Sequence, residues 1–155
     1  MTPMLRDATL HDIDRIVDLG ALMHAESPTW SRLRFSRDKL AAIVELAINQ
    51  GFAKVVDDCG EVVDDCGEVV GGMLALAVPH WFSEDMVACD VAMFIDPAHR
   101  GGMAAVRLLN AYALWAREAG ATLVHFGVTT GVHNDKTQAL CERLGWRQVG
   151  ALMEA

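Results

Sequence analysis

Three neighbouring residues, Arg100, Gly101 and Gly102, form the part of this sequence best suited to hold an anion. They follow a short apolar run, Met86–Ile95, and precede an amphipathic pattern that stops at Gly120. The first N–H groups of a helix are unpaired and partly positive, so a strand, a glycine turn and a helix start together attract phosphate. Arg100 adds a fixed charge, and the glycines let the backbone approach closely. A glycine pair taken alone fits a loop without a ligand better, so the rest of the chain must decide.

Length and composition favour a single globular domain over residues 1–155. A hydrophobic content of 52% indicates a compact chain rather than a disordered one. The formal net charge of −8 argues against a nucleic-acid partner, but a local basic turn is still able to hold a small anion. We find no apolar run near the roughly 20 residues that span a bilayer and no signal-peptide core, so we predict a cytoplasmic protein with no membrane partner.

The cysteines show neither a C-x-x-C pair nor zinc-ligand spacing. We therefore expect reduced thiols, as is usual in the cytosol, and no metal site. The four residues are Cys59, Cys66, Cys89 and Cys141.

Capping residues and apolar periodicity predict one strand and two helices in the first third of the chain. The strand covers residues 4–9. Thr9 then begins a helix, with Asp12 three residues on in an approximate capping box. Ser36 caps the second helix, which ends at Gly51.

The segment between these two helices, residues 24–36, has little periodicity, and Pro28 breaks any helix within it. The mixture of Glu26, Trp30 and Arg32 suits a loop that faces a substrate. A plain connector with Trp30 in the core fits equally well, so both interpretations stay open.

Residues 55–61 are repeated without change as residues 62–68. Two copies are too few for a solenoid, and with one copy removed the sequence predicts two valine-rich strands around a polar turn. We therefore interpret 55–68 as a tandem duplication in a hairpin, which loops tolerate cheaply. The repeat also contains four aspartates, but their spacing is not that of a calcium loop, so a cation site is the less favoured interpretation. These are Asp57, Asp58, Asp64 and Asp65.

The second half of the chain alternates strands and helices. Strands are predicted at 72–79, 86–95, 121–129 and 146–153, and helices before Gly120 and at 136–144. The complete order, β-α-α-β-β-β-α-β-α-β, predicts a mixed α/β domain.

This order and two spaced motifs resemble the GNAT superfamily of acyl-CoA-dependent N-acetyltransferases. In that family a strand ends in an approximate V-D-P, followed by R-G-x-G-x-G/A and a helix that bears L-L. The matching residues are Ile95-Asp96-Pro97, Arg100-Gly101, Ala105 and Leu108-Leu109. Met103 stands where the family has its middle glycine, which is a departure.

The second motif of the family is N-x-x-A-x-x-L-Y-E-K-L-G-F, and it begins here at Asn134, 34 residues after Arg100. Cys141 occupies the tyrosine position, whereas Arg143 and Trp146 are conservative replacements. The identical positions are Asn134, Leu140, Glu142, Leu144 and Gly145. The resemblance implies a mostly antiparallel central sheet flanked by helices.

The resemblance further implies that acetyl-CoA, as co-substrate, gives its acetyl group directly to an amine without a metal. The pantetheine arm would pair with the strand residues Met93, Phe94 and Ile95, one of whose N–H groups could stabilise the oxyanion, and Asn134 would hydrogen-bond the arm. The pyrophosphate would bind N–H groups of the turn and the helix start, residues Arg100, Gly101, Gly102, Met103, Ala104 and Ala105.

The acceptor ammonium must lose a proton, a task that the family often gives to a carboxylate near the fourth strand. Asp90 is the first candidate, although its phase relative to Pro97 requires a bulge, and Glu26 of the 24–36 loop is another. Cys141 stands at the position of the family's proton donor to the thiolate, but a buried packing residue fits it as well. Further candidates for the base are Glu84, Asp85, His80 and His125.

Two alternatives to a working N-acetyltransferase stay open. Met103, Cys141 and the duplication motivate a CoA-binding or regulatory domain with weakened catalysis, and a structural protein without a cofactor is the third reading. The acceptor, a small molecule or a protein amine, is not encoded, although the acidic balance favours a cationic one. The resemblance also admits a homodimer, with the hairpin or the last strand as contact edge.

Overall fold

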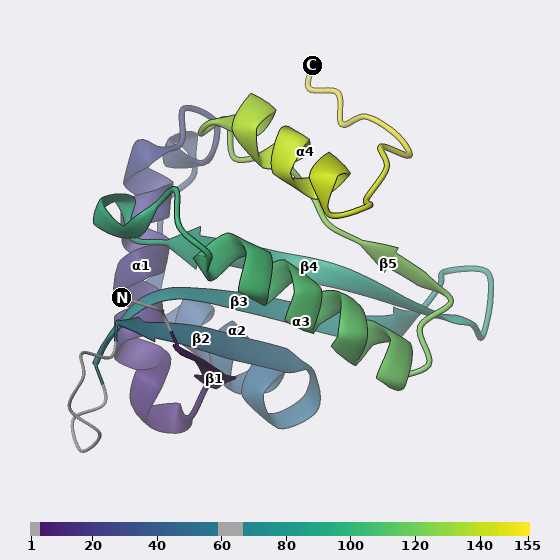
Figure 1. Ribbon diagram of the computed structural model, residues 1–155, viewed down its shortest axis with the longest axis horizontal. Coiled ribbons are helices and arrows are strands. Elements are labelled where there is room, and N and C mark those ends of the chain that lie inside the picture. Colours follow the sequence, from purple (N-terminus) through teal and green to yellow (C-terminus); the bar gives the residue numbers. More distant parts are fainter. Residues whose placement is uncertain (1–3, 59–66) are drawn as a thin grey trace.

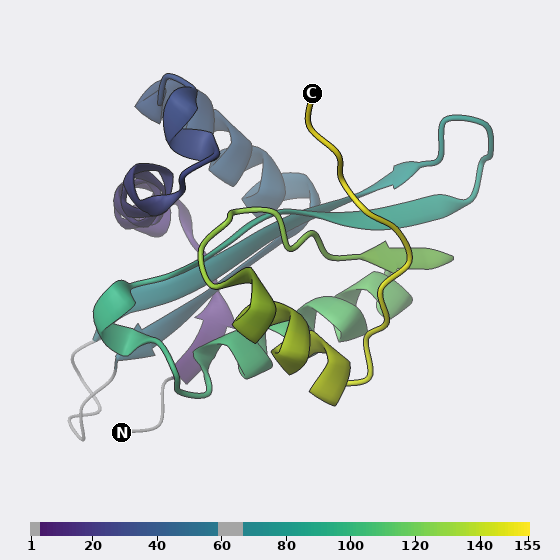
Figure 2. The same cartoon turned by 90° about the horizontal axis from the view of Figure 1, so that it is seen from above.

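The computed structural model describes residues 4–58 and 67–155, which contain one five-stranded sheet (Figure 1). Two hydrophobic clusters lie on opposite faces of this sheet. Helices α1 and α2 cover one face of the sheet, and α3 and α4 lie on the other side (Figure 2). The bounds are β1 (Met4–Asp7), α1 (Ile13–Glu26), α2 (Arg37–Gln50), β2 (Phe52–Asp58), β3 (Glu68–Pro79), β4 (Met86–Ile95), α3 (Ala104–Glu118), β5 (Leu123–His125) and α4 (Asn134–Arg143). The strands lie in chain order, the first three pairings being antiparallel and β4–β5 parallel.

The predicted helix starts are confirmed by their hydrogen bonds. The Thr9 N–H donates to Asp12 Oδ2 over 2.7 Å, at a short 3-10 turn that leads into α1. The Lys39 N–H donates to Ser36 Oγ over 3.2 Å, and Gly51 follows the last residue of α2. These caps act within a few residues, which is why the sequence pattern identifies them.

Helix α3 is held on the sheet by its apolar face, of which Leu108, Leu109 and Tyr112 are fully buried. The Tyr112 hydroxyl donates to the His125 carbonyl over 2.6 Å and so ties the helix to the end of β5. The Trp146 ring stacks on Tyr112 from the other side, at a centroid distance of 6.1 Å. These contacts fix the middle of α3 against the end of β5 and the segment that follows α4.

The duplicated segment joins β2 to β3, and the two strands pair antiparallel as predicted for a hairpin. Residues 59–66, including Asp64 and Asp65, lie outside the described residues. Asp57 is almost fully buried and pairs with Arg6, and no group of three His, Cys, Asp or Glu side chains able to hold a metal occurs among the described residues. None of the described helices is long and apolar enough to cross a membrane.

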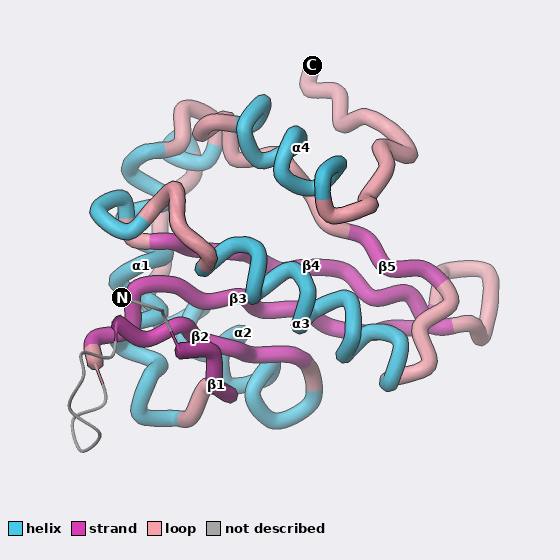
Figure 3. The backbone as a smooth tube through the Cα atoms, viewed as in Figure 1, coloured by secondary structure: helices cyan, strands magenta, loops and turns pink. Residues whose placement is uncertain are grey.

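The predicted final strand at 146–153 is wrong. The segment after α4 runs to the C-terminus without regular structure (Figure 3), and Val149, Leu152 and Met153 are mostly exposed. Only Leu123–His125 of the predicted strand at 121–129 is β-structure, so the neighbouring edge is short. A sixth strand would need a longer edge to pair with, because strands form through ladder hydrogen bonds.

Strand β4 carries the β-bulge that the Asp90 hypothesis requires. Leu74 pairs with Ala92 and Ala75 pairs with Asp90, so Val91 is the extra residue of β4. Strand β5 pairs with β4 only over Val87–Cys89, and the two strands then diverge. The second half of β4 thus has no strand partner on the β5 side among the described residues, and this gap holds the site.

Candidate active site

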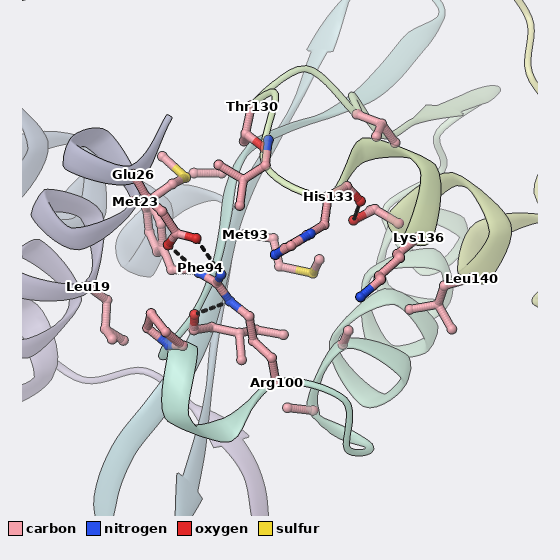
Figure 4. A pocket seen from close by; sticks show the side chains of 18 of the residues that line it. Leu19, Met23, Glu26, Met93, Phe94, Arg100, Thr130, His133, Lys136 and Leu140 are labelled. Carbon is pink, nitrogen blue, oxygen red and sulfur yellow. Dashed lines mark hydrogen bonds and ion pairs between the residues drawn. The ribbon is translucent and has the colours of Figure 1, made fainter. Parts of the chain in front are cut away.

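A cavity of about 1020 Å³ lies where β4 and β5 diverge (Figure 4). Its wall is built from β4, the turn after it, the start of α3, the loop before α4, α4 itself and the end of α1. The predicted cofactor-binding residues on this wall are Met93, Phe94, Ile95, Arg100, Gly101, Gly102, Ala104 and Ala105. Segments that are distant in sequence therefore meet as the sequence analysis expected.

Two predicted cofactor-binding residues do not line the cavity. Met103 is half exposed and precedes the first residue of α3. Asn134 uses its Oδ1 to accept the Gly131 N–H over 3.0 Å, so its side chain holds the loop before α4 in shape. Their roles toward a cofactor stay predictions.

The turn after β4 is shaped for close approach of an anion. Asp96 Oδ1 accepts the Ala98 N–H over 2.9 Å and begins the turn. Gly101 has a φ of +85°, and a Cβ atom added at Gly101 or Gly102 would meet nothing within 4 Å. Met103, the N-cap residue of α3, makes no side-chain capping bond, so it leaves the first N–H groups of the helix without a cap. This open cradle fits a phosphate group.

The open edge of β4 fits an extended ligand arm. Met93, Phe94 and Ile95 pair with β3 on one side and with no described strand on the other. An extended arm with amide groups is able to pair with such an edge as an added strand does. The Ile95 carbonyl on this edge accepts a bond from Arg100 Nε over 3.2 Å.

Asp90 lies on the cavity wall at the β-bulge. Its Oδ1 accepts the Gly127 N–H over 2.8 Å, which orients the carboxylate. Burial raises the pKa of Asp90 above its usual value, although the bond from Gly127 partly opposes the shift. A carboxylate with a raised pKa is a stronger base, so the position and electrostatics of Asp90 suit proton abstraction.

Glu26 also lines the cavity, but its electrostatics are opposite to those of Asp90. Its two oxygens accept from Arg100 over 2.6 Å and 2.7 Å, in a two-pronged ion pair (Figure 4). These hydrogen bonds lower the pKa of Glu26 below its usual value. A carboxylate held in this way is a weak base, which favours Asp90 for the catalytic task.

Cys141 does not line the cavity. Its side chain is buried in the hydrophobic cluster beside α3, and burial raises the pKa of its thiol. The structure therefore favours packing, the alternative that the sequence analysis left open. Four further candidates for the base are also absent from the cavity wall, namely His80, Glu84, Asp85 and His125.

The sequence analysis missed polar residues on the opposite wall, among them His133 and Lys136. His133 and Lys136 point into the cavity from the start of α4 (Figure 4), and the Lys136 ammonium makes no ion pair with any residue that the structure describes. His133 is the residue before α4 and has a left-handed φ of +50°, whereas Lys136 lies in the first turn of the helix. Their position beside Asn134 was the signal that could have identified them.

The 24–36 segment, whose first three residues end α1, faces the cavity through some of its residues. Glu26 and Trp30 lie on the cavity wall, whereas Arg32 pairs with Glu154 outside it. The Trp30 indole donates to the Thr129 carbonyl over 3.2 Å, and Ser27 Oγ donates to the Thr130 carbonyl. These bonds fix the end of α1 to the loop before α4.

Sheet topology, the opening between β4 and β5 and the anion cradle together define an acetyltransferase fold of the α/β class. Residues 21–146 match the acetyltransferase (GNAT) family, and the chain belongs to this family. The resemblance inferred from the two motifs is thus confirmed. No curated protein matches the sequence.

Solved structures share the fold over the whole chain. An acetyltransferase from Trypanosoma brucei is 21% identical with a TM-score of 0.70, and the match covers 99% of each chain. The aminoglycoside N-acetyltransferase AAC(6′)-Iy in complex with CoA is 15% identical with a TM-score of 0.72, covering 99% of this chain and 93% of that one. A transcriptional regulator from Bacillus halodurans is 20% identical with a TM-score of 0.70, covering 99% and 100%.

Proposed function

We propose that the protein transfers an acetyl group from acetyl-CoA directly to an amine of a small molecule or a protein. The observation that carries the proposal is the single cavity that joins the open edge of β4, the anion cradle at Gly101 and Gly102, and the Asp90 carboxylate. Membership in a family of acetyltransferases supports it.

Three features would bind the co-substrate. The N–H groups of the cradle and of the first turn of α3 would hold the pyrophosphate, with charge from Arg100 and from Lys136 across the cavity. Met93, Phe94 and Ile95 would pair with the pantetheine arm. This orientation directs the thioester toward the β-bulge beside Asp90.

Acetyl-CoA supplies an activated acetyl group as a thioester. Asp90 accepts a proton from the acceptor nitrogen as the new C–N bond forms and the C–S bond breaks, and the sulfur leaves with the electron pair. The raised pKa of Asp90 supports this role. We assign Cys141 to packing, because it lies away from the cavity wall.

The carboxylates on the α1 and β4 side of the cavity wall favour a cationic acceptor there, whereas Lys136 and Arg143 lie on the α4 side. Glu26 and Asp90 are the carboxylates on the described wall, and they lie on the side formed by α1 and the β-bulge. AAC(6′)-Iy, which shares the fold, acts on aminoglycosides by its name. We therefore place a primary amine with further positive charges first among candidate acceptors.

Calorimetric titration of acetyl-CoA tests the proposal. We expect micromolar affinity for the unaltered chain, with binding lost in an Arg100→Ala, Gly102→Glu double variant and weakened at least tenfold in Gly102→Glu alone. Space around Gly102 is open, so the new carboxylate acts by repelling phosphate rather than by a clash.

Gly150→Glu is the matched control, because Gly150 also has open space around it and lies outside the cavity wall. We expect it to bind acetyl-CoA like the unaltered chain. Absence of binding by the folded, unaltered chain would reject the acetyltransferase proposal.

A CoA-binding or regulatory domain with weak catalysis is the second candidate function. Met103 at the family's glycine position and Cys141 outside the cavity favour it, and the fold also occurs in a protein called a transcriptional regulator. Affinity for acetyl-CoA without turnover of any of a broad set of amines would support this candidate over the first.

A further inference from the structure

The ion pair between Glu26 and Arg100 joins two residues to which the proposed function gives different ligands. Arg100 belongs to the turn that would hold phosphate, and Glu26 ends α1 on the side of the 24–36 loop. The two residues are 74 positions apart in the sequence, and their side chains meet across the cavity with oxygen–nitrogen distances of 2.6 Å and 2.7 Å. In the ion pair, Glu26 neutralises the positive charge that Arg100 would offer to a phosphate. Arg100 in turn neutralises the negative charge that Glu26 would offer to an ammonium group.

We propose that this pair is an exchange site: Arg100 leaves Glu26 for the phosphates of CoA, and the freed Glu26 carboxylate then binds an ammonium group of the acceptor. Glu26 is thereby a specificity-determining residue for cationic amines, and it becomes available only after the co-substrate has bound. This inference rests on the proposed function, which supplies the anionic ligand.

The position of Arg100 supports the exchange. Besides its bonds to Glu26, its Nε donates to the Ile95 carbonyl over 3.2 Å, at the open edge of β4. The side chain therefore lies over the edge with which an extended arm would pair (Figure 4). Entry of such an arm requires that this bond to Ile95 be given up, which also loosens the hold of Arg100 on Glu26.

Because the ion pair is partly exposed to water, breaking it costs little free energy. The side chains of Arg100 and Glu26 are 31% and 32% exposed, so water is able to replace either partner. Ion pairs of this exposure contribute little to the stability of a protein. A phosphate group that accepts from both a guanidinium and backbone N–H groups is a competitive partner for Arg100.

Glu26 and Arg100 differ in how firmly the fold holds them. The end of α1 is fixed by Ser27, which donates to the Thr130 carbonyl, and by the Trp30 indole, which donates to the Thr129 carbonyl. Arg100 instead lies in the turn beside Gly101, whose φ is +85°. We therefore expect Arg100 to move while Glu26 stays on the cavity wall.

The freed carboxylate would be a suitable anchor for an ammonium group. Hydrogen bonds from Arg100 are the main cause of the lowered pKa of Glu26, so the pKa returns toward its usual acidic value on release, and the group stays ionised near neutral pH. Asp90, the other carboxylate on the described wall, has a pKa raised by burial and suits the proton transfer instead.

Calorimetric titration of CoA distinguishes this exchange from a structural role, here called a brace, in which the Glu26–Arg100 pair stays intact when CoA binds. If Arg100 must first leave Glu26, then Glu26→Gln should tighten CoA binding by about threefold. This factor corresponds to the free energy of the exposed ion pair that no longer has to be broken. Arg100→Gln should weaken binding, and adding Glu26→Gln in that background should change nothing further. If Glu26→Gln leaves CoA affinity unchanged or weakens it, the pair is a brace and the exchange is rejected.

Glu154→Gln is the matched control, since Glu154 also pairs with an arginine but lies outside the cavity. It should leave CoA affinity unchanged. Absence of CoA binding by the unaltered chain would reject the proposed function itself. Equal CoA affinities of the unaltered chain and of Glu26→Gln would reject the exchange alone.

The acceptor half of the inference is tested with spermidine and neamine as probe amines. We expect at least one of them to bind several-fold more tightly when CoA is present, and we expect Glu26→Gln to remove this gain. If neither amine shows a CoA-dependent gain that requires Glu26, its role as an acceptor anchor is rejected.

Discussion

At the scale of single residues, the pKa values of two carboxylates on the cavity wall are shifted in opposite directions. Burial raises the pKa of Asp90, and the bonds from Arg100 lower the pKa of Glu26. Opposite shifts in neighbouring carboxylates often separate a group that moves protons from one that binds charge. On this basis we propose proton transfer for Asp90 and charge binding for Glu26, although their residue types alone would permit either role.

Asp90→Asn tests this assignment. Asn retains an oxygen that accepts the Gly127 N–H, so the β-bulge should keep its shape while the base is lost. We expect kcat to fall by about 100-fold or more, the usual contribution of a positioned base, while the affinity for acetyl-CoA stays unchanged. Steady-state kinetics and calorimetry measure the two quantities. Unchanged kcat in the variant would transfer the role of base to another group.

At the scale of elements, a buried charge network joins the first strand to its neighbours. Arg6 on β1 donates to Asp12 at the entrance to α1 over 2.8 Å and to Asp57 on β2 over 2.7 Å. Asp57 is 1% exposed, so its charge depends on Arg6 for compensation. The network fixes α1 against the sheet, and α1 carries Glu26 at its far end.

Arg6→Met should lower the free energy of unfolding by about 3 kcal/mol at pH 7, because it leaves buried carboxylates unpaired. Arg6 lowers the pKa of Asp12, so this contribution to stability is present above the usual aspartate pKa and is lost as the pH falls through the lowered value. The deficit of the variant should therefore shrink toward pH 3. Urea denaturation at both pH values measures it.

Arg37→Met is the comparison, since Arg37 forms an exposed pair with Asp18. We expect a change within about 0.5 kcal/mol for this variant. If the deficit of Arg6→Met is as small as that of Arg37→Met, the network contributes little to stability. A larger deficit that does not depend on pH would show that the contribution is not electrostatic.

At the scale of the whole molecule, the duplicated segment lies at an end of the sheet, and the cavity is lined by β4, α1, α3 and α4. Residues 55–58 end β2, and Glu68 begins β3. Neither copy of the repeat supplies a residue to the cavity wall within the part of the chain described. Apart from Asp58, whose Oδ2 lies 3.4 Å from Nε2 of His99 on the cavity wall, we infer that the duplication is separate from the site.

Deletion of residues 62–68 should therefore leave acetyl-CoA binding unchanged. The shorter chain still joins Asp58 to a Glu-Val-Val strand, now through Cys-Gly alone. The entropy of closing the shorter connection favours the folded state by about 1 kcal/mol. Thermal denaturation and calorimetric titration test this expectation, and a loss of binding in a stable deletion variant would connect the repeat to the site.

The sequence by itself determined the features that act over a few residues. Thr9, Ser36 and Gly51 bound the helices as predicted, and the two GNAT motifs predicted the family and eight residues of the cavity wall. Each of these features is encoded where it acts, because caps and turns bond to their own neighbours in the chain.

Tertiary structure alone decided which distant groups meet. It paired Glu26 with Arg100, brought His133 and Lys136 into the cavity, buried Cys141 in the core and left the predicted final strand unformed. These outcomes depend on which sheet edge stays open and on which face a helix presents to the core. Such choices are made by packing between segments remote in sequence, and local patterns carry no information about them.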